Sequence, residues 1–398
     1  MPDIREYMKS KKEGKDSSFI KKLLIHRVAV FYKIVILIVA LIAISVGIYV
    51  YFENKVYTKY NVISSVERTD TQTTTYYKYA QGILKCSSDG ASYTDYSNKV
   101  IWNQTFEMNH PMIDICNDYV AIADKEGNKV YVFNTKGYLS EINVNLPIEK
   151  LQVASQGVVY VILNDGTGSK AKVFSKEGEE LAKSDWAMVK SGYPIDIAVS
   201  DDGEKLGVSF LYVDSGIMKT QIGFFNFGSV GQNKIDNLVS AYPYESSVFP
   251  RIAYVNNATA VAFGDKKVAI YKGNQIPEVV KEIEFQDEIR SIYYSDSYFA
   301  LVFDNSDPGA KYRMELYDLE GNKVLNLKFD QDYNNIVINE KEFIIVSEMG
   351  FSIYKMSGLE KFRYSSQKTL LNVMLEGASN RYVIIDSSNT QIINLKLN

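Results

Sequence analysis

The stretch YVFNTKG, residues 131–137, decides the fold because the chain repeats its pattern. An apolar strand end is followed by about three polar residues and a glycine, and a second strand then begins. The copies are KVFSKEG (172–178), GFFNFG (223–228), AIYKG (269–273), ELYDLEG (315–321) and SIYKMSG (352–358). The last aromatic residues before these turns are 37 to 51 residues apart. A period in the low to mid forties with about four short strands per unit is typical of β-propeller blades.

Short runs rich in Val, Ile, Tyr and Phe fill the space between the copies, and Gly, Asn, Asp or Ser interrupt them every 8–12 residues. Examples are YVAIAD (119–124), VVYVIL (158–163), YFALVF (298–303) and RYVIID (381–386). This composition is typical of consecutive antiparallel strands. We therefore predict an all-β chain folded as a β-propeller. An up-and-down barrel, a sandwich pair or a β-helix would lack a sustained period of this length.

The predicted ring has eight blades, which start near residues 73, 111, 150, 193, 250, 288, 332 and 369. Seven blades would result if the first unit merged with the last. The last unit supplies only three strands before the chain stops. We expect its missing outer strand to come from VYTKYNVISSVE (56–67), because a closed ring leaves no open sheet edge.

A second feature is the apolar run IVILIVALIAISVGIYVYF, residues 34–52, which contains no charged residue. At about 1.5 Å per residue, a helix of this length spans close to the ~30 Å hydrocarbon core of a bilayer. A cleaved signal peptide would have a shorter apolar region followed by a small-residue cleavage site, which is absent here. A buried core helix is the other alternative, but no other helical segments are predicted to surround it. We predict one transmembrane helix that binds the lipid bilayer.

Charge predicts the orientation of this helix. Residues 1–33 hold nine Lys or Arg and four Asp or Glu, a net charge of +5, whereas the whole chain carries −4. Basic residues on one side of a span keep that side in the cytoplasm. The predicted parts are a basic cytoplasmic tail (1–33), the transmembrane helix (34–52), a juxtamembrane segment that includes the closing strand (53–72) and an extracytoplasmic propeller (73–398). The location is therefore the cell membrane, with a single pass.

Catalytic signals are sparse. The two histidines are His26, beside the span, and His110, in a predicted connector, so no multi-histidine metal site can form outside. Acidic clusters such as SDDGEK (200–205) have the composition of tight turns, and none has calcium-loop spacing. No Walker loop, HExxH or GxSxG motif occurs. The acidic external part argues against nucleic acid as a partner. We predict no cofactor and no enzyme activity.

Two weaker signals concern single residues. Cys86 and Cys116 lie outside the membrane in predicted neighbouring blades, so they either form a disulfide or remain two packed free thiols. Tyr242, Tyr244 and Phe249 cluster in AYPYESSVFPR (241–251). They are candidate contact residues for a partner, since aromatic rings bury a large area. The alternative is that these rings pack between blades.

The segments YTDYSNKVIW (93–102) and KVFSKEGEELAKSDW (172–186) resemble the repeats of quinoprotein-like, or PQQ-like, propellers, in which an aspartate or aromatic strand, a glycine turn and a tryptophan strand follow one another. The whole arrangement of basic tail, single span and propeller also resembles a membrane-anchored bacterial family, domain of unknown function 5711. The resemblance implies the fold and carries no functional residues. The quinone-dependent dehydrogenases among such propellers have an adjacent cysteine pair and many tryptophans. This chain has two separate cysteines and only Trp102 and Trp186.

Three functions remain open from the sequence. The first is a non-catalytic binding or scaffold module that contacts an unidentified protein or glycan of the cell envelope. The second is a transmembrane sensor that relays external binding to a cytoplasmic partner. The third is a hydrolase of an envelope polymer that uses paired carboxylates.

Overall fold

The computed structural model describes residues 4–12, 16–306, 308–377 and 380–397. The chain divides into two compact units, Met1–Val56 and Tyr57–Asn398. Each unit is described by itself below.

The first unit is helical and contains α1 (Ile4–Lys12) and α2 (Asp16–Glu53). The helix α2 begins well before the predicted segment 34–52, because residues 16–33 contain neither proline nor glycine to end it. Within α2, Lys21–Tyr51 is long and apolar enough to cross a membrane, and it is not buried against other parts of the chain. The predicted candidate span is therefore present as one continuous helix.

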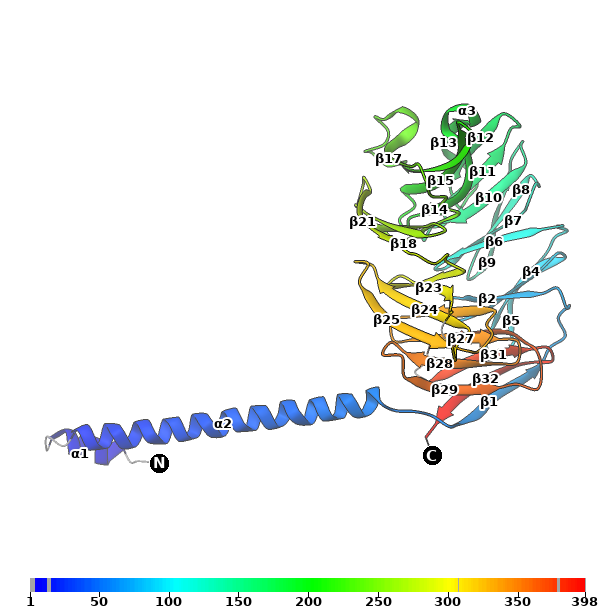
Figure 1. Ribbon diagram of the computed structural model, residues 1–398. Helices are drawn as coiled ribbons and strands as arrows, with labels where there is room; N and C mark the ends of the chain where they lie inside the picture. Colours follow the sequence, from blue (N-terminus) through cyan, green and yellow to red (C-terminus); the bar gives the residue numbers. More distant parts are fainter. Residues whose placement is uncertain (1–3, 13–15, 307, 378–379, 398) are drawn as a thin grey trace. The chain divides into compact units, whose positions relative to one another are not determined.

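The second unit is an eight-bladed β-propeller, as predicted (Figure 1). Each blade is a four-stranded antiparallel sheet. Blades 1 to 4 consist of β2 (Thr75–Tyr79), β3 (Gly82–Ser87), β4 (Gly90–Asp95) and β5 (Val100–Thr105); β6 (Pro111–Cys116), β7 (Tyr119–Asp124), β8 (Lys129–Asn134) and β9 (Gly137–Asn143); β10 (Ile148–Val153), β11 (Val159–Asn164), β12 (Gly168–Phe174) and β13 (Glu180–Ala187); and β14 (Tyr193–Val199), β15 (Lys205–Asp214), β16 (Ile217–Asn226) and β17 (Leu238–Tyr244). Blades 5 to 8 consist of β18 (Arg251–Asn256), β19 (Thr259–Phe263), β20 (Lys267–Lys272) and β21 (Glu278–Glu284); β22 (Ser291–Tyr294), β23 (Tyr298–Asp304), β24 (Tyr312–Asp318) and β25 (Lys323–Phe329); β26 (Asn335–Ile338), β27 (Glu342–Ser347), β28 (Gly350–Lys355) and β29 (Glu360–Ser365); and β30 (Leu370–Leu375), β31 (Arg381–Asp386), β32 (Asn389–Lys396) and β1 (Lys59–Glu67). Two short helices, α3 (Met188–Ser191) and η1 (Ile235–Asn237), lie in connections.

The first strand of each blade is innermost. Contacts join β6 to β10, β10 to β14, β14 to β18 and β30 to β2, which are first strands of neighbouring blades. The eighth blade takes its outer strand from the start of the unit. Strand β1 runs antiparallel to β32, from the pair Lys59–Lys396 to the pair Glu67–Asn389. The predicted closing strand within residues 56–67 is therefore confirmed.

The hydrophobic core is divided among the eight boundaries between consecutive blades. Side chains alternate along each strand, so both faces of a sheet are buried. In β7, Val120 and Ile122 pack toward blade 1, while Ala121 and Ala123 pack toward blade 3. A blade therefore depends on both neighbours for its stability.

Strand direction gives the ring two different faces. The connections between blades and the hairpins between second and third strands lie at one face, which we call the connector face. The hairpins between first and second strands and between third and fourth strands lie at the other, which we call the turn face. Because β1 is a fourth strand, the chain enters the propeller at the turn face, beside the pair Lys59–Lys396.

Residue Tyr57 attaches the beginning of the propeller to blades 7 and 8. Its backbone N–H donates to the carbonyl oxygen of Lys361 at 2.8 Å, and its hydroxyl oxygen accepts from Nδ2 of Asn380 at 3.0 Å. Beside it, the buried Lys361 ammonium bonds the Glu342 carboxylate at 2.5 Å and donates to the Tyr382 hydroxyl at 2.9 Å. The segment before β1 is thus fixed to the ring by a side chain and not by strand pairing alone.

Candidate functional site: the connector face of blades 2 to 4

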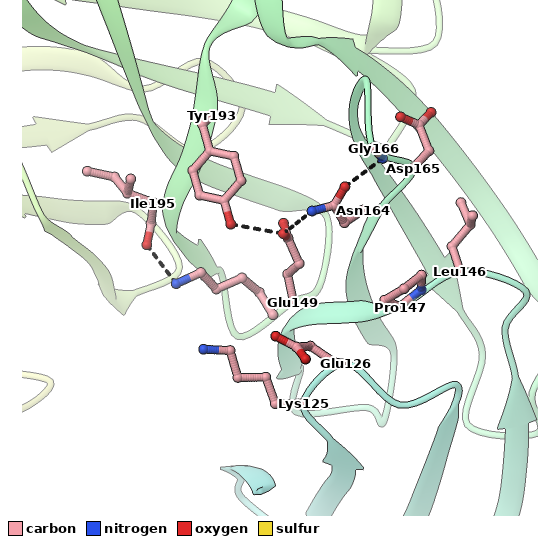
Figure 2. Close-up of a pocket in the computed structure, with 11 residues that line it drawn as sticks. Lys125, Glu126, Leu146, Pro147, Glu149, Asn164, Asp165, Gly166, Tyr193 and Ile195 are labelled. Carbon is pink, nitrogen blue, oxygen red and sulfur yellow. Dashed lines mark hydrogen bonds between the residues drawn. The ribbon is translucent and has the colours of Figure 1, made fainter.

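A cleft of about 800 Å³ opens at the connector face where blades 2, 3 and 4 meet (Figure 2). Its residues come from the β7–β8 hairpin, the connection into β10, the start of β10, the β11–β12 hairpin and the start of β14. They are Lys125, Glu126, Leu146, Pro147, Glu149, Lys150, Asn164, Asp165, Gly166, Tyr193 and Ile195. Rigid strand ends therefore position most of the polar groups in the cleft.

Glu149 is the centre of a hydrogen-bond network in this cleft. Its Oε1 accepts from Nδ2 of Asn164 at 2.7 Å and from the hydroxyl of Tyr193 at 2.9 Å, as Figure 2 shows. Oδ1 of Asn164 in turn accepts from the backbone N–H of Gly166 at 2.7 Å. The second carboxylate oxygen of Glu149, Oε2, has no hydrogen-bond partner among the described residues. The network joins blades 3 and 4 and holds these side chains in fixed orientations.

The electrostatics of the cleft keep Tyr193 as a donor. Burial, followed by the hydrogen bond to Glu149 and the charge of that carboxylate, raises the pKa of Tyr193 to about 12. The ammonium of Lys150 donates to the carbonyl oxygen of Ile195 at 2.6 Å. The exposed side chains of Lys125 and Glu126 form no ion pair or side-chain hydrogen bond with any part of the chain that the structure describes. These two charges are therefore available at the mouth of the cleft.

A projecting hairpin is the second feature of this face. Strands β15 and β16 pair with each other over ten residues, from Lys205–Asn226 to Asp214–Ile217. Their neighbours stop earlier, because β14 reaches only Leu211 and β17 reaches only Thr220. At about 3.3 Å per residue, the three remaining pairs extend the hairpin by about 10 Å. Blade 4 therefore carries a two-stranded projection that neither β14 nor β17 flanks.

The tip of this hairpin is apolar and exposed. Val213, Ile217 and Met218 are 68%, 57% and 61% exposed. Val189 in α3, which contacts β15, is 99% exposed. Near the tip, Lys219 pairs with Asp214 at 2.8 Å and with Glu245. Val213 and Met218 pair across the hairpin, so their exposed side chains lie together on one side of the tip and form a small apolar surface.

The inner-strand carboxylates are engaged in joining blades. Asp114 of β6 accepts from the backbone N–H of Val153 in β10 at 2.7 Å, and Asp196 of β14 accepts from that of Ile252 in β18 at 2.9 Å. Burial raises the pKa of Asp114 to about 6 and also raises that of Asp196. Among the residues that the structure describes, no group of three or more His, Cys, Asp or Glu is placed to hold a metal ion. The two inner-strand carboxylates therefore join consecutive inner strands.

The candidate contact aromatics lie elsewhere, and they pack between blades, which is the alternative that the sequence left open. Tyr244 and Phe249 are buried, with ring centroids 4.5 Å apart, and the Tyr244 hydroxyl lies 2.6 Å from that of Tyr271. Tyr242 is partly buried and donates its hydroxyl to the carbonyl oxygen of Pro277 at 2.9 Å. The segment forms β17 and the start of blade 5, where rings fill the boundary between the two blades.

The two cysteines are free, so of the two alternatives left open by the sequence, packed thiols and not a disulfide apply. Cys86 packs in the boundary of blades 1 and 2. Cys116 lies on the opposite face of blade 2, toward blade 3, with Sγ 4.0 Å from Oδ1 of Asp201. The sheet of blade 2 therefore separates the two sulfur atoms. Burial raises the pKa of both thiols to about 12, which keeps them protonated near neutral pH.

Solved structures with the same fold are distant in sequence. BamB from Moraxella catarrhalis is 11% identical with a TM-score of 0.53, and the match covers 84% of this chain and 100% of BamB. A eukaryotic initiation factor is 11% identical with a TM-score of 0.55 (85% and 87% covered), and AztD from Citrobacter koseri is 8% identical with a TM-score of 0.53 (74% and 87% covered). Identities this low show the propeller fold alone. No curated protein matches the chain in sequence.

The family model that matches is described as a family of unknown function, DUF5711, and the match runs over residues 53–395. It covers the propeller from its closing strand to the last strand of blade 8. The resemblance found in the sequence is thereby confirmed. The chain belongs to DUF5711, a family of unknown function.

Proposed function

We propose that this protein is a membrane-anchored, non-catalytic scaffold that binds another protein of the cell envelope through its connector face. The observation that carries the proposal is the projecting β15–β16 hairpin with its exposed Val213, Ile217 and Met218. A monomer gains nothing from holding these side chains in water, whereas a partner would bury them. The acidic groups Asp214 and Glu245 beside the tip favour a protein over an anionic lipid surface, which attracts basic residues.

The point where the chain enters the propeller supports this role. We propose that α2 crosses the membrane once, with residues 1–33 in the cytoplasm and the propeller outside. The chain joins the propeller at the turn face, and the hairpin extends from the connector face. The attachment therefore does not occupy the surface that we assign to the partner.

A hydrolase remains a less favoured proposal. Hydrolysis of a glycoside requires two carboxylates that are free to act on one bond. Asp114 and Asp196 each accept a backbone hydrogen bond from the next blade, which accounts for their position without a catalytic role. Loss of activity toward an envelope polymer in Asp114→Asn or Asp196→Asn, with the fold retained, would favour the hydrolase.

Site-specific photo-crosslinking in the native membrane tests the scaffold proposal. A photoreactive amino acid replaces Val213 or Met218 in the full-length chain, and a matched chain carries it at Lys136, which is exposed at the turn face. We expect one discrete protein adduct from the hairpin positions and none from position 136. Adducts from position 136 alone, or no protein adduct from the hairpin, would contradict the proposal.

A transmembrane sensor is the second candidate, and the attachment of Tyr57 favours it. Only residues 54–58 separate the end of α2 from the start of β1, and Tyr57 is bonded to Lys361 and Asn380. A conformational change in the propeller could therefore be transmitted to α2, because the connecting segment is short. Deletion of residues 1–20, which leaves the basic residues nearest the span, separates the candidates. A scaffold keeps its partner and its cellular effect, whereas a sensor keeps the partner and loses the effect.

A further inference from the structure

We propose that the cleft between blades 2, 3 and 4 binds a neutral saccharide unit of an envelope glycan. This ligand is separate from the protein partner that we assign to the β15–β16 hairpin. The argument rests on the size of the cleft, on the residue types that line it, on their charge balance and on the fixed groups around Glu149.

Size and composition favour a small polar ligand over a protein side chain. The volume of about 800 Å³ lies within the range of roughly 300–1,000 Å³ typical of small-molecule sites. Six of the eleven lining residues are Lys, Glu, Asp or Asn: Lys125, Glu126, Glu149, Lys150, Asn164 and Asp165. The cores of protein interfaces are depleted in Lys, Glu and Asp and enriched in large apolar groups. The cleft has the opposite composition.

The charges within the cleft nearly balance, with two lysines and three carboxylates, which favours a ligand without a net charge. Glu126 and Glu149 are matched by Lys125 and Lys150. The fifth charge, Asp165, has its Oδ2 3.5 Å from the ammonium of Lys170, a cation outside the cleft that also lies 3.6 Å from Asp185. An anionic ligand would meet the glutamates, and a cationic ligand would meet the lysines. A ligand rich in hydroxyl groups can instead donate to the carboxylates and accept from the ammonium groups.

The groups around Tyr193 supply both parts of saccharide recognition. The Tyr193 side chain is 36% exposed, and its hydroxyl is held by Glu149. Its ring, together with Pro147 and Ile195, offers an apolar surface to the C–H face of a sugar. Lys125 and Glu126 at the mouth offer a donor and an acceptor that nothing in the described chain uses. Because the Tyr193–Glu149–Asn164 network is already formed, binding does not need to order it.

Binding of defined oligosaccharides to the full-length chain in lipid nanodiscs tests the proposal. The probes are an array of neutral, amino and acidic oligosaccharides that includes maltotetraose and N-acetylated chitotetraose, followed by calorimetry on the ligands that bind. We expect binding to be confined to neutral sugars. Tyr193→Ala, which removes the ring, and Glu149→Gln, which removes the charged acceptor, should each raise Kd about tenfold or more.

Two further variants keep the result interpretable. Tyr193→Phe retains the ring and should weaken binding less than Tyr193→Ala does. Tyr138→Ala removes another exposed tyrosine, on β9 outside the cleft, and should leave Kd unchanged. The melting temperature of each variant checks that it is folded.

Three outcomes would overturn the proposal. They are no sugar bound, only acidic or amino sugars bound, or neutral sugars bound with the same Kd in Tyr193→Ala and Glu149→Gln. Any of these results leaves the scaffold proposal intact, because that proposal depends on the crosslinking at Val213 and Met218. Conversely, a failed crosslinking experiment does not change the Kd measured here.

Discussion

Several polar side chains of this propeller form hydrogen bonds that join neighbouring blades. Asp114 and Asp196 each accept a backbone N–H from the next inner strand, and Gln152 bonds both an N–H and a carbonyl oxygen of blade 4. These contacts satisfy backbone groups that face the centre of the ring, where no further strand can pair with them. Their cost is that a carboxylate such as that of Asp114 must be partly removed from water.

The burial of Asp114 predicts that the stability of the propeller depends on pH. Burial raises its pKa from the ordinary 3.8 to about 6, so the folded chain holds this proton more tightly than the unfolded chain does. The stability contributed by Asp114 is therefore largest below about pH 4 and is lost as the pH rises through about 6. The difference in melting temperature between the wild type and Asp114→Asn (wild type minus variant) should fall as the pH rises from about 4 to about 6, and it should stay constant at higher pH.

Melting curves of the full-length chain in detergent between pH 4 and pH 8 provide the measurement. Asp118→Asn, an exposed residue two positions after the end of β6, is the matched control and should give a difference that does not change with pH. A difference for Asp114→Asn that stays constant or rises with pH would contradict the assignment.

The buried ion pair of Glu342 and Lys361 gives a second prediction at this scale. Both side chains are largely buried, at 7% exposure each, and Tyr382 completes their hydrogen bonds. Lys361→Met should destabilise the propeller by about 3 kcal/mol, because it leaves a buried carboxylate without its partner. The double variant Glu342→Gln/Lys361→Met should recover most of this loss in a thermal or urea unfolding experiment. A double variant as unstable as the single one would show that the methionine packs badly and that charge is not the cause.

At this scale the sequence predicted least. Glu149, Asn164 and Tyr193 are common residue types at ordinary positions, and the cleft arises only when three strands are brought together. One feature of the sequence could have indicated this contact. Glu149 and Tyr193 lie at the beginnings of consecutive inner strands, one blade period apart, so the repeat places them side by side at the same face of the ring. The sequence could not decide the place of the aromatic cluster, because Tyr244 and Phe249 are the same residue types whether they face a partner or fill a blade boundary.

At the scale of elements, the repeat predicted the blades well. The first strands begin at Thr75, Pro111, Ile148, Tyr193, Arg251, Ser291, Asn335 and Leu370, close to the predicted positions. This agreement follows from alternation, since each strand must bury both faces against neighbouring blades. The length of the β15–β16 hairpin could not be predicted in the same way. Its last pairs, Tyr212–Lys219 to Asp214–Ile217, lie beyond the paired parts of β14 and β17, so the repeat does not specify them.

The pairing of the closing strand β1 with β32 can be tested by mutation. We expect Ser64→Pro/Ser65→Pro to lower the melting temperature by several degrees, because one of two adjacent residues must present its N–H to β32 and proline has none. Amide hydrogen exchange in β32 (Asn389–Lys396) should accelerate, while exchange in blade 4 should not. Ser64→Ala/Ser65→Ala is the matched control and should resemble the wild type. Exchange in β32 that stays as slow as in the wild type would mean that β1 does not hold the ring closed.

At the scale of the whole molecule, the proposed orientation can be checked directly. Tags at the two ends of the full-length chain should differ in sealed cells, with the amino-terminal tag protected from added protease and the carboxy-terminal tag cleaved. The reason is the basic residues that precede the apolar segment of α2. Replacing Lys21, Lys22, Arg27 and Lys33 with glutamine should reduce the fraction in this orientation, whereas the same change at four propeller lysines should not. Protection of both tags in the wild type would contradict a single pass.

The place where β1 begins has a mechanical consequence. A tension between the apolar helix α2 and a partner on the connector face would first load the hydrogen bonds of Tyr57 to Lys361 and Asn380, and beyond them it would act along β1. Strand β1 is paired with β32 from Lys59 to Glu67, so such a load would shear these pairs together and would not peel them apart one after another. The strand that closes the ring is thus oriented so that its resistance to force grows with the number of pairs that share the load.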